Sequence, residues 1–245
     1  MISNKKAKFI KSLQLKKYRK QEQSFLVEGK VSVLELLNSN LSIQALYTTD
    51  EFYQSHIHEQ ADSEVVEIVD ERDLIKVGTL KSNNAALAIV SMPEDKQSID
   101  ISQPVLVLDD INDPGNLGTI IRIADWYGFH QLICSPETTD QYNPKCISAT
   151  KGSFTRVSIF EQHLPEFLSD YKHPIFGALL EGEDVHKAGF QKACAILIGN
   201  ESHGIQPDLL PFITDPITIP RFGGAESLNA AIATAIICDV YRQKV

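Results

Sequence analysis

The sequence of 245 residues lacks the features that mark several common protein classes. No apolar run reaches about 18 residues, so no membrane-spanning helix is expected. The N-terminal lysines are not followed by the apolar core that a secretory signal requires. The four cysteines are widely spaced and form no C-x-x-C pair, which argues against a zinc site and against a disulfide framework. We therefore expect a cytoplasmic protein with reduced thiols, without a metal ion and without contact to a membrane.

Glycine-rich nucleotide-binding signatures are missing as well. The segment DPGNLG at residues 113–118 has neither the spacing of G-x-G-x-x-G nor a Lys-Ser/Thr pair after it. A P-loop or a Rossmann NAD site is therefore poorly supported. The sequence also lacks a catalytic triad motif. Both absences disfavour a small-molecule α/β enzyme, which is one alternative for the function.

The acidic excess of the chain hides a basic start. The net charge is −9, but the first 30 residues carry +7 and the other 215 residues carry −16. A basic arm on an acidic body is typical of proteins that bind a nucleic-acid phosphate backbone. The densest cluster, which we predict to contact phosphates, consists of Lys16, Lys17, Arg19 and Lys20. The alternative is a solvated terminus without a partner.

Alternating apolar strands and helical patterns indicate two α/β domains. We expect a small domain over residues 1–92, which begins with a helix at 5–20. A polar, proline-bounded linker follows at 93–103, and a larger domain occupies 104–245. In the larger domain a buried strand leads into a helix at 117–127, for which Asn116 is the expected N-cap.

The last third of the chain holds two apolar strands, at 195–198 and 217–219, and each runs into a loop of glycines and polar residues. Ser227 is the expected N-cap of a helix at 228–241. If the two strand ends lie near each other, their loops form the kind of crevice at which open α/β sheets bind ligands. The alternative is a pair of ordinary strand–turn–helix connections.

Arg122 is unusual because it lies in a helix whose neighbouring residues, 120, 121, 123 and 124, are all apolar. An arginine in this setting must leave the core or meet an anion, and its planar fork suits a phosphate. The alternative is a side chain that extends along the apolar surface to water. Glu201 has two readings too, since it either positions Arg122 or caps the turn after its own strand.

Three stretches together resemble the SpoU-type RNA ribose 2′-O-methyltransferases of the SPOUT superfamily. They occur in the order and spacing of the family. The first, DPGNLGTIIRIA, is matched by Asn116 and Arg122. The second motif, Gly-Asn-Glu after a strand, is matched by Gly199, Asn200, Glu201 and Gly204. The third motif, Ile-Pro followed by Ser-Leu-Asn, is matched by Ile219, Pro220, Ser227, Leu228 and Asn229. Arg221 is a departure, since many relatives have methionine there.

The resemblance implies a fold and a cofactor. The second domain would be an α/β domain whose C-terminal segment forms a trefoil knot, and the first would be a small α/β domain that binds the substrate RNA. S-adenosylmethionine would lie in the knot. The cofactor-binding residues that we carry over from the resemblance are Leu179, Gly199, Asn200, Ile219 and Leu228.

The resemblance also implies a reaction, the transfer of a methyl group to a ribose 2′-hydroxyl of ribosomal or transfer RNA by a homodimer. Arg122 would favour the alkoxide that develops at the hydroxyl. The residues expected to orient Arg122 and the ribose are Asn116, Glu201, Ser227 and Asn229. The alternative is an RNA-binding or ribosome-assembly protein that has the same fold without catalysis.

Overall fold

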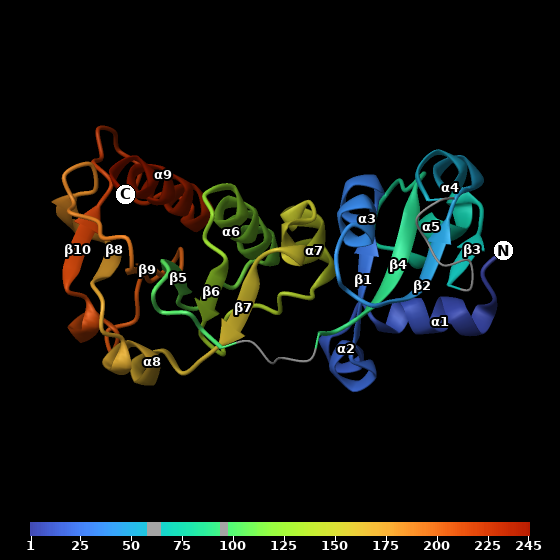
Figure 1. The fold of residues 1–245 in the computed structure, drawn as a ribbon, viewed down its shortest axis with the longest axis horizontal. Coiled ribbons are helices and arrows are strands. Elements are labelled where there is room, and N and C mark those ends of the chain that lie inside the picture. The colour runs from blue at the N-terminus through green and yellow to red at the C-terminus, as the bar shows by residue number, and fades with distance from the viewer. Residues whose placement is uncertain (58–64, 94–97) are drawn as a thin grey trace. The chain divides into compact units, whose positions relative to one another are not determined.

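The computed structural model describes residues 1–57, 65–93 and 98–245, and the chain falls into two compact units (Figure 1). The first unit comprises Met1–Lys96 and Asp140–Thr155, and the second comprises Gln97–Thr139 and Arg156–Val245. None of the helices in the described parts of the chain is both long and apolar enough to cross a membrane. Of the predicted linker at 93–103, residues 94–97 lie outside the described residues.

The first unit is built on a four-stranded sheet with the order β1-β4-β2-β3. Strand β4 is antiparallel to both β1 and β2, and β2 is parallel to β3. Its N-terminal part contains α1 (Asn4–Ser12), α2 (Lys16–Glu22), β1 (Ser24–Glu28), α3 (Lys30–Leu37), β2 (Ile43–Thr48), α4 (Asp50–His56), β3 (Val66–Ile68), α5 (Glu71–Val77) and β4 (Ala86–Ser91).

The predicted helix at 5–20 is wrong as a single element, since the chain forms α1 and α2 with a break between them. Leu15 has an extended backbone and precedes the first residue of α2. Leu13, the C-cap of α1, is buried in the core of the unit. The helical pattern that looks continuous in the sequence is therefore broken at residues 13–15.

Residues 140–155, which we assigned to the second domain from the sequence, pack in the first unit. They form α7 (Pro144–Thr150) and a 3₁₀ turn, η1 (Ser153–Thr155). The ring of Phe25 in β1 lies 4.6 Å from that of Tyr142 and 6.1 Å from that of Phe154, measured between centroids. The segment thus completes the core of the first unit, although it follows β6 in the chain.

Arg19 in α2 is buried, with 1% of its surface exposed. Its Nη2 lies 2.6 Å from Asp140 Oδ2, and its Nη1 donates a 2.9 Å hydrogen bond to the carbonyl of Leu13. The prediction that Arg19 contacts phosphates is therefore wrong, because its charge is already paired inside the unit. Lys16, Lys17 and Lys20 remain exposed.

The second unit is built on a parallel six-stranded sheet with the order β10-β8-β9-β5-β6-β7, which confirms the α/β class. Helices α6 and α9 lie beside each other on one face of this sheet, and α8 lies on the other (Figure 1). The trefoil knot stays a prediction. The elements are β5 (Val105–Leu108), α6 (Pro114–Trp126), β6 (Gln131–Cys134), β7 (Ser158–Glu161), α8 (Leu164–Asp170), β8 (Ile175–Asp184), β9 (Ala195–Ile198), η2 (Leu210–Phe212), β10 (Asp215–Thr218) and α9 (Ala230–Lys244).

Two predicted helix caps are wrong. The N-cap of α6 is Asp113, whose carboxylate accepts hydrogen bonds from the backbone N–H groups of residues 115 and 116. Pro114 then occupies the first helical position, where its missing N–H costs nothing. The N-cap of α9 is Asn229, and its side-chain oxygen accepts from the N–H groups of residues 231 and 232. Asn116 and Ser227 therefore have no capping role.

Candidate functional site

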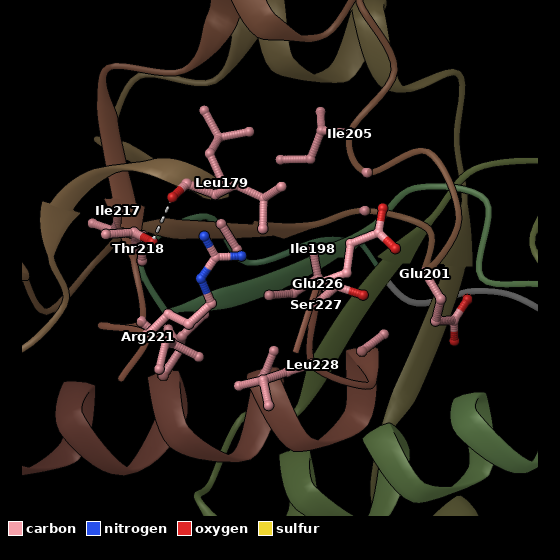
Figure 2. A pocket seen from close by; sticks show the side chains of 18 of the residues that line it. Leu179, Ile198, Glu201, Ile205, Ile217, Thr218, Arg221, Glu226, Ser227 and Leu228 are labelled. Atoms are coloured by element: carbon pink, nitrogen blue, oxygen red, sulfur yellow. Dashed lines mark hydrogen bonds between the residues drawn. The ribbon is translucent and has the colours of Figure 1, made fainter. Parts of the chain in front are cut away.

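The second unit contains a cavity of about 790 Å³ at the carboxyl edge of its sheet (Figure 2). Its walls include residues of β8 and two loops that we define here. The first loop, residues 199–206, follows β9, and the second loop, residues 219–229, connects β10 to α9. Since both loops line one cavity, the predicted crevice exists, although β8 lies between β9 and β10 in the sheet.

The cavity has apolar walls with a few polar side chains. Leu179, Ile198, Ile217 and Leu228 approach it from different elements, and the guanidinium of Arg221 extends into it (Figure 2). The five residues predicted to bind a cofactor all line the cavity: Leu179, Gly199, Asn200, Ile219 and Leu228. Glu201 and Ser227 line it as well, whereas Asn116, Arg122 and Asn229 are not among the lining residues.

The first loop is held by a close backbone pairing. Asn200 and Gly204 exchange two backbone hydrogen bonds of 3.1 and 2.9 Å. A Cβ atom at Gly199 would overlap the backbone of Gly204 and Ile205. Glycine is therefore required at 199, because the backbone of residues 204 and 205 passes too close to it for a side chain. The same close approach brings backbone N–H and C=O groups to the cavity wall.

Backbone and side-chain groups just after β5 hold the same loop. Asn200 Nδ2 donates a 2.6 Å hydrogen bond to the carbonyl of Asp110, and Asn200 Oδ1 accepts from the N–H of Ser202 at 2.7 Å. Asp109 Oδ2 accepts from the N–H of Gln206 at 2.7 Å, and Asp109 Oδ1 accepts from Gln206 Nε2 at 3.2 Å. Both ends of the loop are thereby attached to two consecutive aspartates.

Sequence reasoning missed these aspartates, although paired acidic residues at the carboxyl end of a buried strand are a usable signal. Burial raises the pKa of Asp109, and the Gln206 N–H lowers it by a smaller amount. Asp110 has a φ of +55°, and its Oδ2 lies 3.0 Å from His203 Nε2. The strained backbone of Asp110 thus belongs to the support of the first loop.

Asn116 connects three parts of the site. Its Nδ2 donates to Glu201 Oε1 in the first loop, and its Oδ1 accepts from Asn229 Nδ2 at 3.0 Å. Because an amide side chain both donates and accepts, Asn116 joins the start of α6, the first loop and the N-cap of α9. The structure therefore brings together three of the five predicted catalytic residues.

Arg122 and Ser227 stand apart from this network. Arg122 is exposed on α6 and makes no hydrogen bond or ion pair with any residue in the described ranges 1–57, 65–93 and 98–245. The carboxylate of Glu201 accepts a hydrogen bond from Asn116. This contact matches neither of the two roles predicted for Glu201, the positioning of Arg122 or the capping of a turn. Ser227 lines the cavity, and its side chain is exposed.

The parallel sheet, the cavity at its carboxyl edge and the polar network beside it define an α/β domain with the equipment of an enzyme. The profile of the SpoU rRNA Methylase family matches residues 103–239, more than half of the chain. The chain belongs to this family. The profile of the MRM3-like substrate binding domain matches residues 4–88.

Individual relatives agree with the family. The chain is 30% identical over 239 residues to the 23S rRNA (guanosine(2553)-2'-O)-methyltransferase RlmP of Bacillus subtilis, covering 96% of this chain and 94% of the relative. A TrmH-family protein of known structure from Porphyromonas gingivalis is 32% identical, with a TM-score of 0.89 and full coverage of both chains.

A third relative bears on the cofactor. The AdoMet-bound rRNA methyltransferase from Sinorhizobium meliloti is 26% identical, with a TM-score of 0.83 and coverage of 99% of this chain and 96% of that one. Together the comparisons confirm the predicted family, the α/β fold class and an S-adenosylmethionine-dependent RNA methyltransferase.

Proposed function

We propose that the protein transfers the methyl group of S-adenosylmethionine to a ribose 2′-hydroxyl of ribosomal RNA. The observation that carries this proposal is that the second and third sequence motifs line one cavity, and that Asn116 of the first motif is joined to them by hydrogen bonds with Glu201 and Asn229. Ribosomal RNA is favoured over transfer RNA because the Bacillus subtilis relative, which aligns along nearly the whole chain, is a 23S rRNA enzyme.

The residues of the cavity fit this cofactor. Its volume of about 790 Å³ lies within the range of small-molecule sites. The apolar side chains of Leu179, Ile219 and Leu228 would hold the nucleoside part, and the backbone of residues 199 and 200 would bind its polar edges. When bound, S-adenosylmethionine supplies an electrophilic methyl group on a sulfonium.

The protein's own task is to make a weak nucleophile react. A ribose 2′-hydroxyl must lose its proton as it attacks, and holding it in attack geometry supplies much of the acceleration. The Arg122 guanidinium, a planar cation, stabilises the negative charge that develops on the hydroxyl oxygen. Asn116, Glu201 and Asn229 orient the ribose, and Ser227 contributes from the cavity wall.

The decisive test of this mechanism is Arg122→Ala. Methyl transfer to ribosomal RNA should fall by about 10²–10³-fold or more, because a preorganised charge is lost from the reacting oxygen. Arg122→Lys should also be poor, since a point charge does not reproduce the planar fork. Cofactor affinity, measured by calorimetry, should remain close to that of the wild type. Turnover of Arg122→Ala at the wild-type rate would contradict the role of Arg122.

Calorimetry with the wild type also separates the enzyme from the non-catalytic alternative. An assembly factor with the same fold would bind RNA without a requirement for S-adenosylmethionine. Tight cofactor binding together with new 2′-O-methylation in RNA from a deletion strain, after the gene is restored, supports the enzyme. Binding of RNA without either result would support the alternative.

The first unit is proposed to bind the RNA through its exposed lysines Lys16, Lys17 and Lys20 in α2. Each lost phosphate contact should reduce the salt slope of RNA binding by roughly 0.7–0.9. The test replaces all three with Ala and uses the triple Ala variant of Lys172, Lys187 and Lys192, exposed residues of the second unit, as a charge-matched control. Equal salt slopes in both variants would contradict the proposal.

Point substitutions are preferable to removal of residues 1–92. The segment 140–155 packs in the first unit, so such a truncation would expose Ile147 and Phe154 along with their core neighbours. A loss of function in the truncated protein would then reflect misfolding as much as lost RNA contacts.

The protein is also proposed to act as a homodimer. Trp126 on α6 is 82% exposed and Ile232 on α9 is 54% exposed, on two helices that pack against each other. Burial of such residues against a second copy would remove apolar surface from water. Sedimentation of the wild type and of Trp126→Glu tests this, with a shift to monomer expected in the variant. The cytoplasmic location stays a prediction.

A further inference from the structure

The second loop presents an aromatic side chain that is almost fully exposed to solvent. Phe222 is 99% exposed, the highest value among the large apolar side chains of the described residues. It belongs to the lining of the cavity mouth, five residues before Ser227. Two glycines, Gly223 and Gly224, follow it, and a Cβ at either position would meet no atom within 4 Å.

The side chain of the neighbouring Arg221 is directed into the cavity (Figure 2). Its Nη1 donates a 3.3 Å hydrogen bond to the carbonyl of Ala225, across the turn of the loop. Phe222, by contrast, is almost fully exposed, so its ring lies in solvent at the cavity mouth.

We propose that Phe222 is a base-stacking residue, which receives a nucleobase at or beside the target nucleotide of the RNA. This inference rests on the proposed function. The target ribose must reach the cavity that holds the cofactor, so the strand passes the cavity mouth at which Phe222 stands. Sequence-specific RNA sites are mostly single-stranded, and their unstacked bases commonly pack on aromatic side chains.

The energetics favour this occupant. A base that leaves its own stack loses stacking energy, and a flat aromatic surface at the site replaces it. The contact is apolar and tolerant of base identity, so it adds affinity for RNA without choosing the base. Phe222 is thus a positioning residue for the substrate, in contrast to Arg122, which acts on the reacting oxygen.

The experiment compares Phe222→Ala, Phe222→Trp and a matched control, Ile101→Ala, which removes another exposed apolar side chain of the second unit. Phe222→Ala should raise KM for RNA about 5- to 150-fold, the cost of one lost stacking contact. The value of kcat at saturating RNA and the Kd for S-adenosylmethionine should stay within about twofold. Phe222→Trp should restore KM, and the salt slope of binding should not change because no charge is lost.

Three results would overturn the inference. An unchanged KM would mean that the ring stays in solvent during the reaction. A weaker Kd for S-adenosylmethionine in Phe222→Ala would assign the ring to the cofactor, and a shift toward monomer in sedimentation would assign it to the partner subunit. Each of these leaves methylation by the wild type intact, whereas absence of methylation by the wild type would overturn the proposed function instead.

Discussion

The two loops that line the cavity are supported in different ways. The first loop, residues 199–206, is attached to Asp109, Asp110 and Asn116 by side-chain hydrogen bonds and is paired with itself through Asn200 and Gly204. In the second loop, every residue from 221 to 229 is exposed. Among the described residues, one hydrogen bond joins two residues of the segment 219–228, and it runs from Arg221 to the carbonyl of Ala225.

This difference indicates a division of labour. The first loop is a preformed wall, whose polar groups are already in place before any ligand binds. The second loop has few contacts of its own, which suits its proposed role as a segment that meets both cofactor and RNA. Preorganisation lowers the cost of binding, whereas an open loop admits a large substrate.

The largest effect that would test the difference between the two loops is expected from replacing one glycine in each loop with valine. Gly199→Val should weaken binding of S-adenosylmethionine by about 100-fold or more, because the new side chain forces the backbone of Gly204 and Ile205 to move. Gly223→Val, where a Cβ meets no atom within 4 Å, is the matched control and should bind within a few-fold of the wild type. Calorimetry measures both, with circular dichroism to verify folding. Equal affinities would show that the first loop is as adaptable as the second.

Asn116→Ala should have the next largest effect, since Asn116 is joined to Glu201 in the first loop and to Asn229 at the end of the second. We expect kcat to fall by about 100-fold, the loss that small misplacements of reacting groups produce. Thr119→Ala, an exposed substitution one turn further along α6, should leave kcat unchanged. Single-turnover methylation assays provide the rates. If Asn116→Ala changed only cofactor affinity, the network would belong to the pocket and not to the reaction.

Asn200→Ala tests the support of the first loop by stability. Its side chain bonds the carbonyl of Asp110 and the N–H of Ser202, and its loss leaves both groups without these partners. The free energy of unfolding should fall by about 1–3 kcal/mol. Ser202→Ala, which removes an exposed hydroxyl and keeps the backbone N–H, should cost much less. Denaturant unfolding measures the free energy of unfolding of both variants. Equal losses in the two variants would contradict the role of the Asn200 side chain in supporting the first loop.

Asp109→Asn should give the smallest effect, and one that depends on pH. Burial raises the pKa of Asp109 above its ordinary value of 3.8, so the folded state holds this proton more tightly than the unfolded state. The contribution of Asp109 to stability is therefore highest at acidic pH and falls as pH rises through the folded pKa.

An asparagine at 109 has no proton to lose, and its oxygen still accepts from the N–H of Gln206. The melting temperature of Asp109→Asn relative to the wild type should thus rise with pH from about pH 4 and then level off. A constant difference between the two proteins across the pH range would mean that the Asp109 carboxyl has the same pKa in both states.

The residues of the cavity were predictable because the motifs of the family are local in the sequence. Gly199, Ile219 and Leu228 were carried over from the resemblance, and the structure places all three at one cavity. The helix caps were less predictable. Asn116 and Asp113 are both good N-cap residues three positions apart, and the choice fell to Asp113 because Pro114 fits the first helical position.

Long-range pairings were out of reach of local reasoning. Arg19 and Asp140 are 121 positions apart, and nothing in a lysine-rich helix distinguishes the one cation that is buried. The placement of residues 140–155 could not be predicted locally either. Their apolar side chains complete the core of the first unit, although in the sequence they follow β5 and β6 of the second unit.

The sequence by itself determined the class of fold, the family and five residues that line the cavity, since strand periodicity, glycines and motif spacing are properties of neighbouring residues. Only the tertiary structure decided what each polar side chain does. In the structure, Arg19 forms a buried ion pair with Asp140. Asn116 donates a hydrogen bond to Glu201 and does not cap a helix. The side chain of Phe222 is exposed to solvent. The physical reason is that a charge or an amide takes its role from the partner it meets, and these partners lie many residues away in the chain.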